Sequence, residues 1–137
     1  MTTGRGAVRL PPYAAALGIR IDHWDGAYPV IALDFSTMVN GNPKAFHGGA
    51  LGGLLEMAAI AALQAEVNED GLPPRLKPAN LTVEFLRGAG MHTTYARGEV
   101  VRRGRRLANL RAVAWQESPD KPVAICFTNV LLAPHKQ

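Results

Sequence analysis

The longest apolar stretch of the chain runs from His47 to Val67, and its apolar residues are not confined to one face. Leu, Ile, Met, Ala and Gly fill it so densely that a helix formed there is apolar on nearly every side. Such a helix has to be covered by other elements on most sides. The sequence after it, residues 68–74, contains Gly and two Pro, so we predict that the helix ends near Val67.

Shorter segments on both sides of this helix have other patterns. Residues 11–18 predict a short helix with prolines at its start, and residues 19–23 and 28–35 predict two strands around a turn at Asp25-Gly26. Residues 36–46, which contain Asn-Gly and Asn-Pro, predict a loop. After the long helix we predict four strands, at residues 81–86, 93–102, 107–116 and 123–132.

Strands joined by short turns form a largely antiparallel sheet, and the all-apolar helix needs a surface to pack against. The predicted fold class is therefore α+β, with a curved, largely antiparallel sheet wrapped around the long central helix. The 137 residues contain no linker or repeat, so we expect one domain over residues 1–137. The glycine pairs at 48–49 and 52–53 fit close packing of a neighbouring element against the helix.

Composition indicates the class of protein and the cellular compartment that suits it. With 47% apolar and 19% charged residues, the chain has the composition of an ordinary globular protein. Its single cysteine, Cys126, cannot form a disulfide framework and suits a reducing compartment. The N-terminus lacks an apolar signal segment, and no segment is interpreted as a membrane span. We therefore expect a cytoplasmic protein without a membrane partner.

The formal net charge of +4 is unevenly distributed. Five arginines fall within ten residues: Arg102, Arg103, Arg105, Arg106 and Arg111. This cluster indicates either one anionic partner or a solvated turn. Nucleic acid is not expected, because aromatic residues are not interleaved with the arginines. The four histidines are too dispersed for a metal motif, so we expect neither a metal nor a cofactor.

One carboxylate interrupts the apolar helix. Glu56 is the only acidic residue between Lys44 and Glu66, and a buried carboxylate is costly unless it is paired, protonated or used. His47 lies nine residues earlier, on the opposite side of a helix and about 13 Å away along its axis. A site that uses both residues therefore most simply requires two chains, and a two-fold dimer would contain two such sites.

The expected helix start has its own chemistry. The first amides of a helix lack an intrahelical acceptor and carry the positive end of the helix dipole, and Gly48 and Gly49 leave them open. Such amides can polarise a carbonyl, while a carboxylate opposite them can attack it or activate water. These features indicate acyl transfer to water. The sequence also leaves structural explanations open: a capping His47, packing glycines, and a Glu56 bonded to backbone amides or to an arginine across an interface.

The stretch His47-Gly48-Gly49, six residues and then Glu56 resembles the hotdog-fold acyl-CoA thioesterases of the PaaI-like family, which are related to hydroxybenzoyl-CoA thioesterases. Residues 104–111 also resemble the entry to that family's penultimate strand. The resemblance implies a hotdog fold, an acyl-CoA substrate, and dimers that pair into a homotetramer with the site at the dimer interface. It implies that Glu56 is the nucleophile or general base, that the Gly48 amide polarises the thioester carbonyl, and that His47 supports this arrangement.

Further site residues are assigned from the resemblance. Family members often carry Asn or Gln six residues before the histidine, where this chain has Gly41. A one-residue change in the loop would bring Asn40 or Asn42 into this role; we assign Asn42, which can also serve only the turn before Pro43. For substrate binding we assign Gly49 and the arginines suited to CoA phosphates, namely Arg87, Arg102, Arg103, Arg105 and Arg106.

The sequence does not define the acyl group. Candidates for its pocket, which can equally be core residues, are Phe46, Leu55, Ile60, Phe85 and Met91. Two other functions also stay open. One is a hotdog 3-hydroxyacyl thioester dehydratase or hydratase, although the Pro-rich helix entry of one such group is missing here. The other is a non-catalytic acyl-CoA-binding hotdog protein whose carboxylate only stabilises the dimer.

Overall fold

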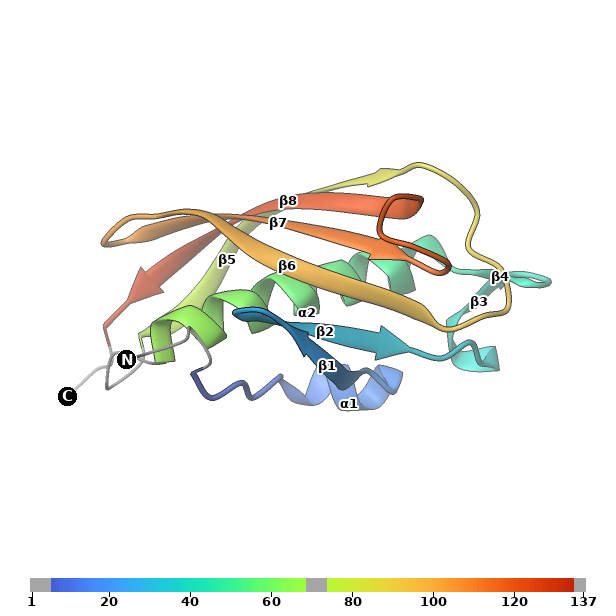
Figure 1. The fold of residues 1–137 in the computed structure, drawn as a ribbon, viewed down its shortest axis with the longest axis horizontal. Coiled ribbons are helices and arrows are strands. Elements are labelled where there is room, and N and C mark those ends of the chain that lie inside the picture. The colour runs from blue at the N-terminus through green and yellow to red at the C-terminus, as the bar shows by residue number, and fades with distance from the viewer. Residues whose placement is uncertain (1–5, 69–73, 135–137) are drawn as a thin grey trace.

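The computed structural model describes residues 6–68 and 74–134, and a long helix, α2 (Gly48–Val67), runs through its centre (Figure 1). Leu54, Leu55 and Leu63 on this helix are fully buried. By length and composition α2 could cross a membrane, but 78% of its apolar window is buried inside the fold, as expected for a core helix. The predicted helix is confirmed, while most of the predicted breaker segment lies outside the described residues.

A six-stranded antiparallel sheet curves over α2 (Figure 1). Its strand order is β1-β2-β6-β7-β8-β5, so β5, which follows α2 in the chain, forms one edge. The strands are β1 (Arg20–Asp25), β2 (Tyr28–Leu33), β5 (Arg75–Phe85), β6 (Thr94–Arg103), β7 (Leu107–Trp115) and β8 (Pro122–Ala133). The predicted fold class, a curved antiparallel sheet around a central helix, is confirmed.

Small residues bring the sheet close to α2. Alternate residues of β6 and β7 are buried, and many are alanines: Ala96, Ala108, Ala112 and Ala114. Gly98 on β6 lies against the backbone of Ala58 on α2, where an added Cβ would collide with the Ala58 carbonyl. The all-apolar helix therefore sits directly on a sheet surface with little side-chain volume.

A short helix, α1 (Pro12–Leu17), lies on the side of α2 away from the main part of the sheet (Figure 1). It begins at prolines, as predicted, and ends at Gly18, which has a positive φ of 87°. Tyr13 of α1 packs against Gly53 of α2, where a Cβ would overlap its ring and hydroxyl. Gly53 thus provides the contact surface for Tyr13 of α1, whereas Gly52 faces Val83 of β5.

The predicted loop at residues 36–46 has more structure than the sequence indicates. It contains a 3₁₀ turn, η1 (Thr37–Val39), and a two-stranded hairpin of β3 (Asn40–Asn42) and β4 (Ala45–Phe46). The turn of this hairpin includes Lys44, which has a positive φ of 72°. The Asn-Pro pair therefore reverses the chain, as turn formers do, but the flanking residues also pair with each other.

Strand β5 begins six residues earlier than predicted, at Arg75 rather than Leu81. Residues 75–80 include a proline and several polar residues, which are not typical of a strand. Among the described strands β5 pairs only with β8, so its other side is an open edge. Pro78 has no N–H to donate, and on this open side no ladder hydrogen bond is lost.

Candidate functional site

The start of α2 is fixed by His47. Its backbone is extended, with φ −66° and ψ 136°, and its Nδ1 accepts a 2.8 Å hydrogen bond from the Gly49 N–H. The backbone N–H of His47 donates to the Val39 carbonyl at 2.7 Å, which anchors the residue on the preceding turn. His47 is therefore an N-cap, and in its neutral form the ring carries its proton on the exposed Nε2.

One amide of this helix start stays open. The N–H groups of Ala50 and Leu51 donate to the His47 carbonyl at 3.0 and 3.2 Å, and that of Gly49 donates to the His47 ring. Within residues 6–68 and 74–134, the Gly48 N–H has no acceptor. The Phe85 ring of β5 lies against Gly48, since a Cβ there would be 3.3 Å from Phe85 Cζ. Gly48 thus presents a donor at the positive end of the helix dipole.

Glu56 lies at the middle of α2 and is only partly buried, although Leu54 and Leu55 beside it are fully buried. No hydrogen bond or ion pair reaches its carboxylate from the described part of the chain. Burial raises the pKa of the nearby Cys126 thiol to about 11, and the charge of Glu56 adds to this rise. A single chain therefore gives this carboxylate no structural partner, and pairing across an interface stays open.

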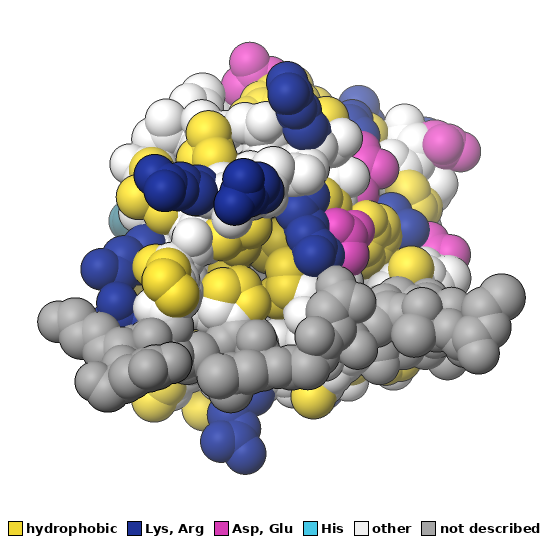
Figure 2. Space-filling view, turned by 90° about the vertical axis from the view of Figure 1, so that its left-hand side faces the viewer, with side chains coloured by type: hydrophobic (Ala, Val, Ile, Leu, Met, Phe, Trp, Pro, Cys, Tyr) yellow, Lys and Arg dark blue, Asp and Glu magenta, His cyan; other side chains and the backbone are white. Residues whose placement is uncertain are grey.

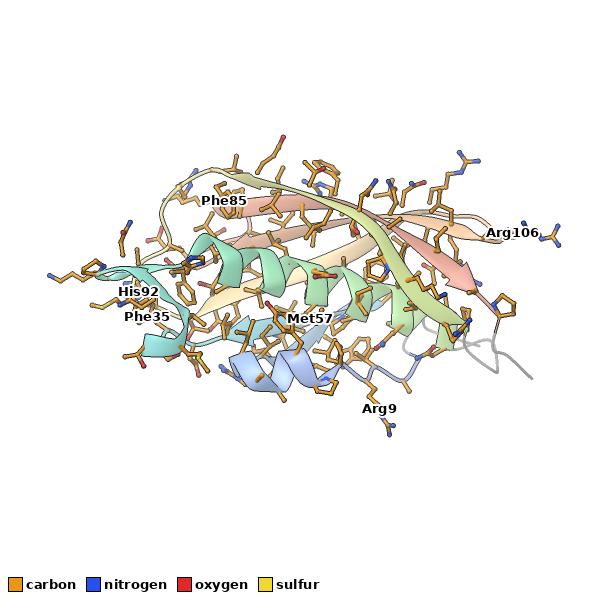
Figure 3. All side chains as sticks on the ribbon, turned by 180° about the vertical axis from the view of Figure 1, so that it is seen from behind. Arg9, Phe35, Met57, Phe85, His92 and Arg106 are labelled. Carbon is orange, nitrogen blue, oxygen red and sulfur yellow. The ribbon has the colours of Figure 1, made fainter. Side chains whose placement is uncertain are left out.

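A groove of about 480 Å³ opens at Glu56. Its wall on α2 is formed by Glu56, Met57, Ile60, Gln64 and Asn68. Residues 9–12 form the facing wall, and Leu76 and Pro78 of β5 line one side. Figure 3 shows Met57 between α2 and α1. Glu56 is thus the first α2 residue along a mainly apolar groove.

The candidate pocket residues divide into groove and core. Ile60 is buried in the core cluster and also lines the groove. Leu55 is buried in the core, and Phe46 packs edge-on against Phe35 at 5.2 Å between ring centroids. Phe85 covers Gly48, and Met91 is exposed. Sequence reasoning missed the groove wall at residues 9–12, because nothing in the sequence indicates that this segment returns to α2.

The structure does not bring His47 and Glu56 together in one chain. Both lie on α2, nine residues apart, so they face opposite sides and are separated by about 13 Å along the axis. Beside α2, one side of β5 pairs with β8, and its other side is unpaired in the described residues. The site predicted from the sequence is therefore incomplete within one protomer.

The asparagines near His47 make no bond to it. The backbone of Gly41 lies against His47, where an added Cβ would be 2.7 Å from the His47 Cα. Asn40 pairs with Phe46 and Asn42 pairs with Ala45 in the hairpin. Neither asparagine side chain has a hydrogen bond to His47 among the described residues, so a catalytic role for Asn42 stays a prediction.

The predicted arginines lie at two ends of the molecule. Arg102, Arg103, Arg105 and Arg106 surround the turn between β6 and β7, near the C-terminal end of α2, where Arg103 pairs with Glu66 at 3.4 Å. Figure 2 shows Lys and Arg side chains gathered at this end, and Figure 3 shows Arg106 far from Phe85. Because α2 is about 30 Å long, one chain does not bring this turn to His47.

Arg87, in contrast, follows β5 near the start of α2. It lines an open cavity of about 550 Å³ together with His92 and Lys121, neither of which the sequence singled out. The loop that contains this cavity is joined to the helix entry, because the Phe46 N–H donates to the Ala89 carbonyl at 2.9 Å. Of the predicted arginines, Arg87 is therefore the one that a single chain brings near His47.

A curved sheet around a central helix, with an open amide at the helix start and a carboxylate halfway along it, defines the class of hotdog-fold thioesterases. Residues 41–131 match the family model described as the acyl-CoA thioesterase N-terminal domain. The chain belongs to this family, whose members act on acyl-CoA thioesters. No curated protein matches the chain.

Solved structures with the same fold include proteins linked to phenylacetic acid degradation. A degradation-related protein from Ralstonia eutropha is 26% identical, with a TM-score of 0.75 over 94% of this chain and 96% of that chain. PaaI from Escherichia coli is 20% identical, with a TM-score of 0.75 over 92% and 87%. A point mutant of PaaI from Thermus thermophilus is 23% identical, with a TM-score of 0.72 over 89% and 99%. These likenesses confirm the hotdog fold.

Proposed function

We propose that this protein hydrolyses an acyl-CoA thioester to the free acid and CoA, with Glu56 of one chain acting on a carbonyl bound at the α2 start of a second chain. The observation that carries this proposal is Glu56 itself. It is a carboxylate without a partner in the described residues, at the mouth of a mainly apolar groove. Membership of an acyl-CoA thioesterase family supports the same reaction.

The second chain would join at the edge of β5. Most β5 side chains are exposed in one chain, including Phe85 and Leu81, and an unpaired edge of 11 residues is a ready surface for a second strand. Two-fold pairing of β5 edges would be antiparallel. It would bring the α2 start of one chain toward the middle of the partner's α2, giving two equal sites. We propose that such dimers pair further into a tetramer.

The proposed chemistry follows from the two helix positions. The thioester oxygen accepts a hydrogen bond from the Gly48 N–H, so the helix start stabilises the negative charge that develops on this oxygen. Glu56 either attacks the carbonyl carbon, forming an anhydride that water cleaves, or removes a proton from the attacking water. In both cases the C–S bond breaks, oxygen from water enters the acid, and the CoA sulfur leaves as thiolate or thiol. His47 keeps the helix start in position through Gly49.

The arginines would bind the phosphates of CoA. In an antiparallel dimer, the turn carrying Arg102, Arg103, Arg105 and Arg106 of one chain lies toward the end where the partner's α2 begins. Arg87 reaches this end from the same chain as the helix start. Clustered guanidinium groups suit phosphate oxygens. We also propose the cytoplasm as the location, where CoA esters are available and the buried Cys126 stays reduced.

The proposed reaction is tested by thiol release from a panel of acyl-CoA esters. Glu56→Gln keeps the size of the side chain and removes its charge, so we expect turnover to fall by about 10²-fold or more. The control Glu99→Gln changes a carboxylate of the outer sheet surface that pairs with Arg111 at 3.1 Å, and it should keep full activity. Undiminished hydrolysis by Glu56→Gln would rule out the mechanism, and crotonyl-CoA hydration without hydrolysis would reassign the enzyme.

A further inference from the structure

We propose that the groove beside Glu56 selects an unbranched aliphatic acyl chain, which extends along α2 from Glu56 toward Gln64 and Asn68. This inference rests on the proposed function, since it takes Glu56 as the reacting carboxylate. Two features of the groove carry it: its direction and the chemistry of its walls.

The groove follows the helix axis. Glu56, Ile60 and Gln64 are spaced four residues apart, so their side chains form one stripe along α2. From Glu56 to Gln64 the helix advances about 12 Å, the length of an extended alkyl chain of roughly eight to ten carbons. A substrate carbonyl beside Glu56 thus has a long, narrow path for its acyl group rather than a wide pocket.

The walls of this path are aliphatic. Leu10, Pro11 and Pro12 face Met57 and Ile60 across the groove. No aromatic residue lines it in the described part of the chain. The Arg9 side chain points away into solvent in Figure 3, so its charge does not enter the channel. An aryl group would find no ring to stack against, whereas a flexible alkyl chain can pack on proline, leucine and methionine side chains.

Hydrogen bonds between α2 and the N-terminal segment hold the facing wall in place. The Arg9 N–H donates to Gln64 Oε1 at 2.8 Å, and Gln64 Nε2 donates to the Arg9 carbonyl at 2.9 Å. Further along the helix, the Gly6 N–H donates to the Ala65 carbonyl at 2.7 Å. The groove continues past this pair, because Asn68 and Pro74 also line it. The hydrogen bonds therefore fix the facing wall along α2 and leave the path of the acyl chain open.

The wild-type enzyme tests the inference with straight-chain CoA esters from butyryl to palmitoyl and with phenylacetyl and benzoyl esters. We expect kcat/KM to rise by about fourfold per methylene from butyryl to decanoyl, with the aryl esters well below decanoyl. Equal rates at all lengths, or a preference for aryl esters, would overturn the inference while leaving the hydrolase intact. Absence of Glu56-dependent hydrolysis of every ester would instead overturn the proposed function.

A variant that fills the groove tests whether the acyl chain of the substrate binds there. Ile60→Trp should lower the ratio of decanoyl to butyryl turnover by about tenfold or more, since it blocks the path beyond one helical turn. The matched control Ile21→Trp changes an exposed residue of β1 and should keep the wild-type ratio. Leu76→Trp, on the half-exposed wall, gives the same test if Ile60→Trp does not fold. An unchanged ratio in a folded groove variant would contradict the assignment.

Discussion

His47 has a structural part in the site that can be separated from chemistry. Its ring caps α2 through the Gly49 amide and leaves the Gly48 amide as the open donor. The sequence indicated His47, Gly48 and Glu56 as candidate site residues because a charge in an apolar helix and a glycine-opened helix start are local signals. It could not tell which amide is already bonded, because that depends on the histidine rotamer. Gly49 is therefore the amide that the cap uses, and its contact with substrate stays a prediction.

The capping role predicts a rescue by asparagine. His47→Ala should lower the free energy of unfolding by about 1 kcal/mol, because the Gly49 N–H loses its acceptor. His47→Asn keeps a side-chain acceptor at the cap and should recover most of this stability. Urea denaturation followed by circular dichroism measures both. Equal stability of the alanine variant and wild type would show that the bond to Gly49 contributes nothing.

At the scale of elements, the sequence predicted what alternation and composition can encode. The apolar run predicted α2, and alternating residues predicted β6, β7 and β8 to within a residue or two at each end. The early part of β5 was missed because an edge strand tolerates the proline and polar residues of 75–80. The hairpin of β3 and β4 was missed because its residues are exposed turn formers, apart from Phe46 and Ala45.

Two glycines, one on β6 in tight contact with α2 and one on α2 with room beside it, predict opposite effects on stability when each is replaced by alanine. Gly98→Ala should destabilise the protein by about 1–3 kcal/mol, because the new Cβ meets the rigid backbone of Ala58. Gly52→Ala has room, since its Cβ would be 3.8 Å from Val83 Cγ2, and it should stabilise α2 by up to about 1 kcal/mol. Thermal unfolding of both variants checks the pair. A Gly98→Ala protein as stable as wild type would mean that the sheet can move away from the helix.

At the scale of the whole molecule, contacts between segments far apart in the sequence form the groove. The groove at Glu56 depends on the N-terminal segment, which meets α2 through a hydrogen-bonded pair, Arg9 and Gln64, 55 residues apart in sequence. No local pattern in the sequence indicates this contact. The separation of His47 and Glu56, in contrast, follows from helix geometry alone, and it led directly to the expectation of two chains. That composite site is the central claim.

Mixed dimers test this claim most directly. Gly48→Pro removes the proposed donor, because proline is tolerated at the first helical position and the extended backbone of His47 suits a following proline. The added ring meets only the tip of the exposed Phe85 side chain, which can shift. Gly48→Pro and Glu56→Gln should each be inactive alone. Dimers reassembled from equal amounts of both should recover about a quarter of wild-type thiol release, since half are mixed and each of those has one intact site. Mixed dimers that form but stay inactive would contradict a site shared between chains.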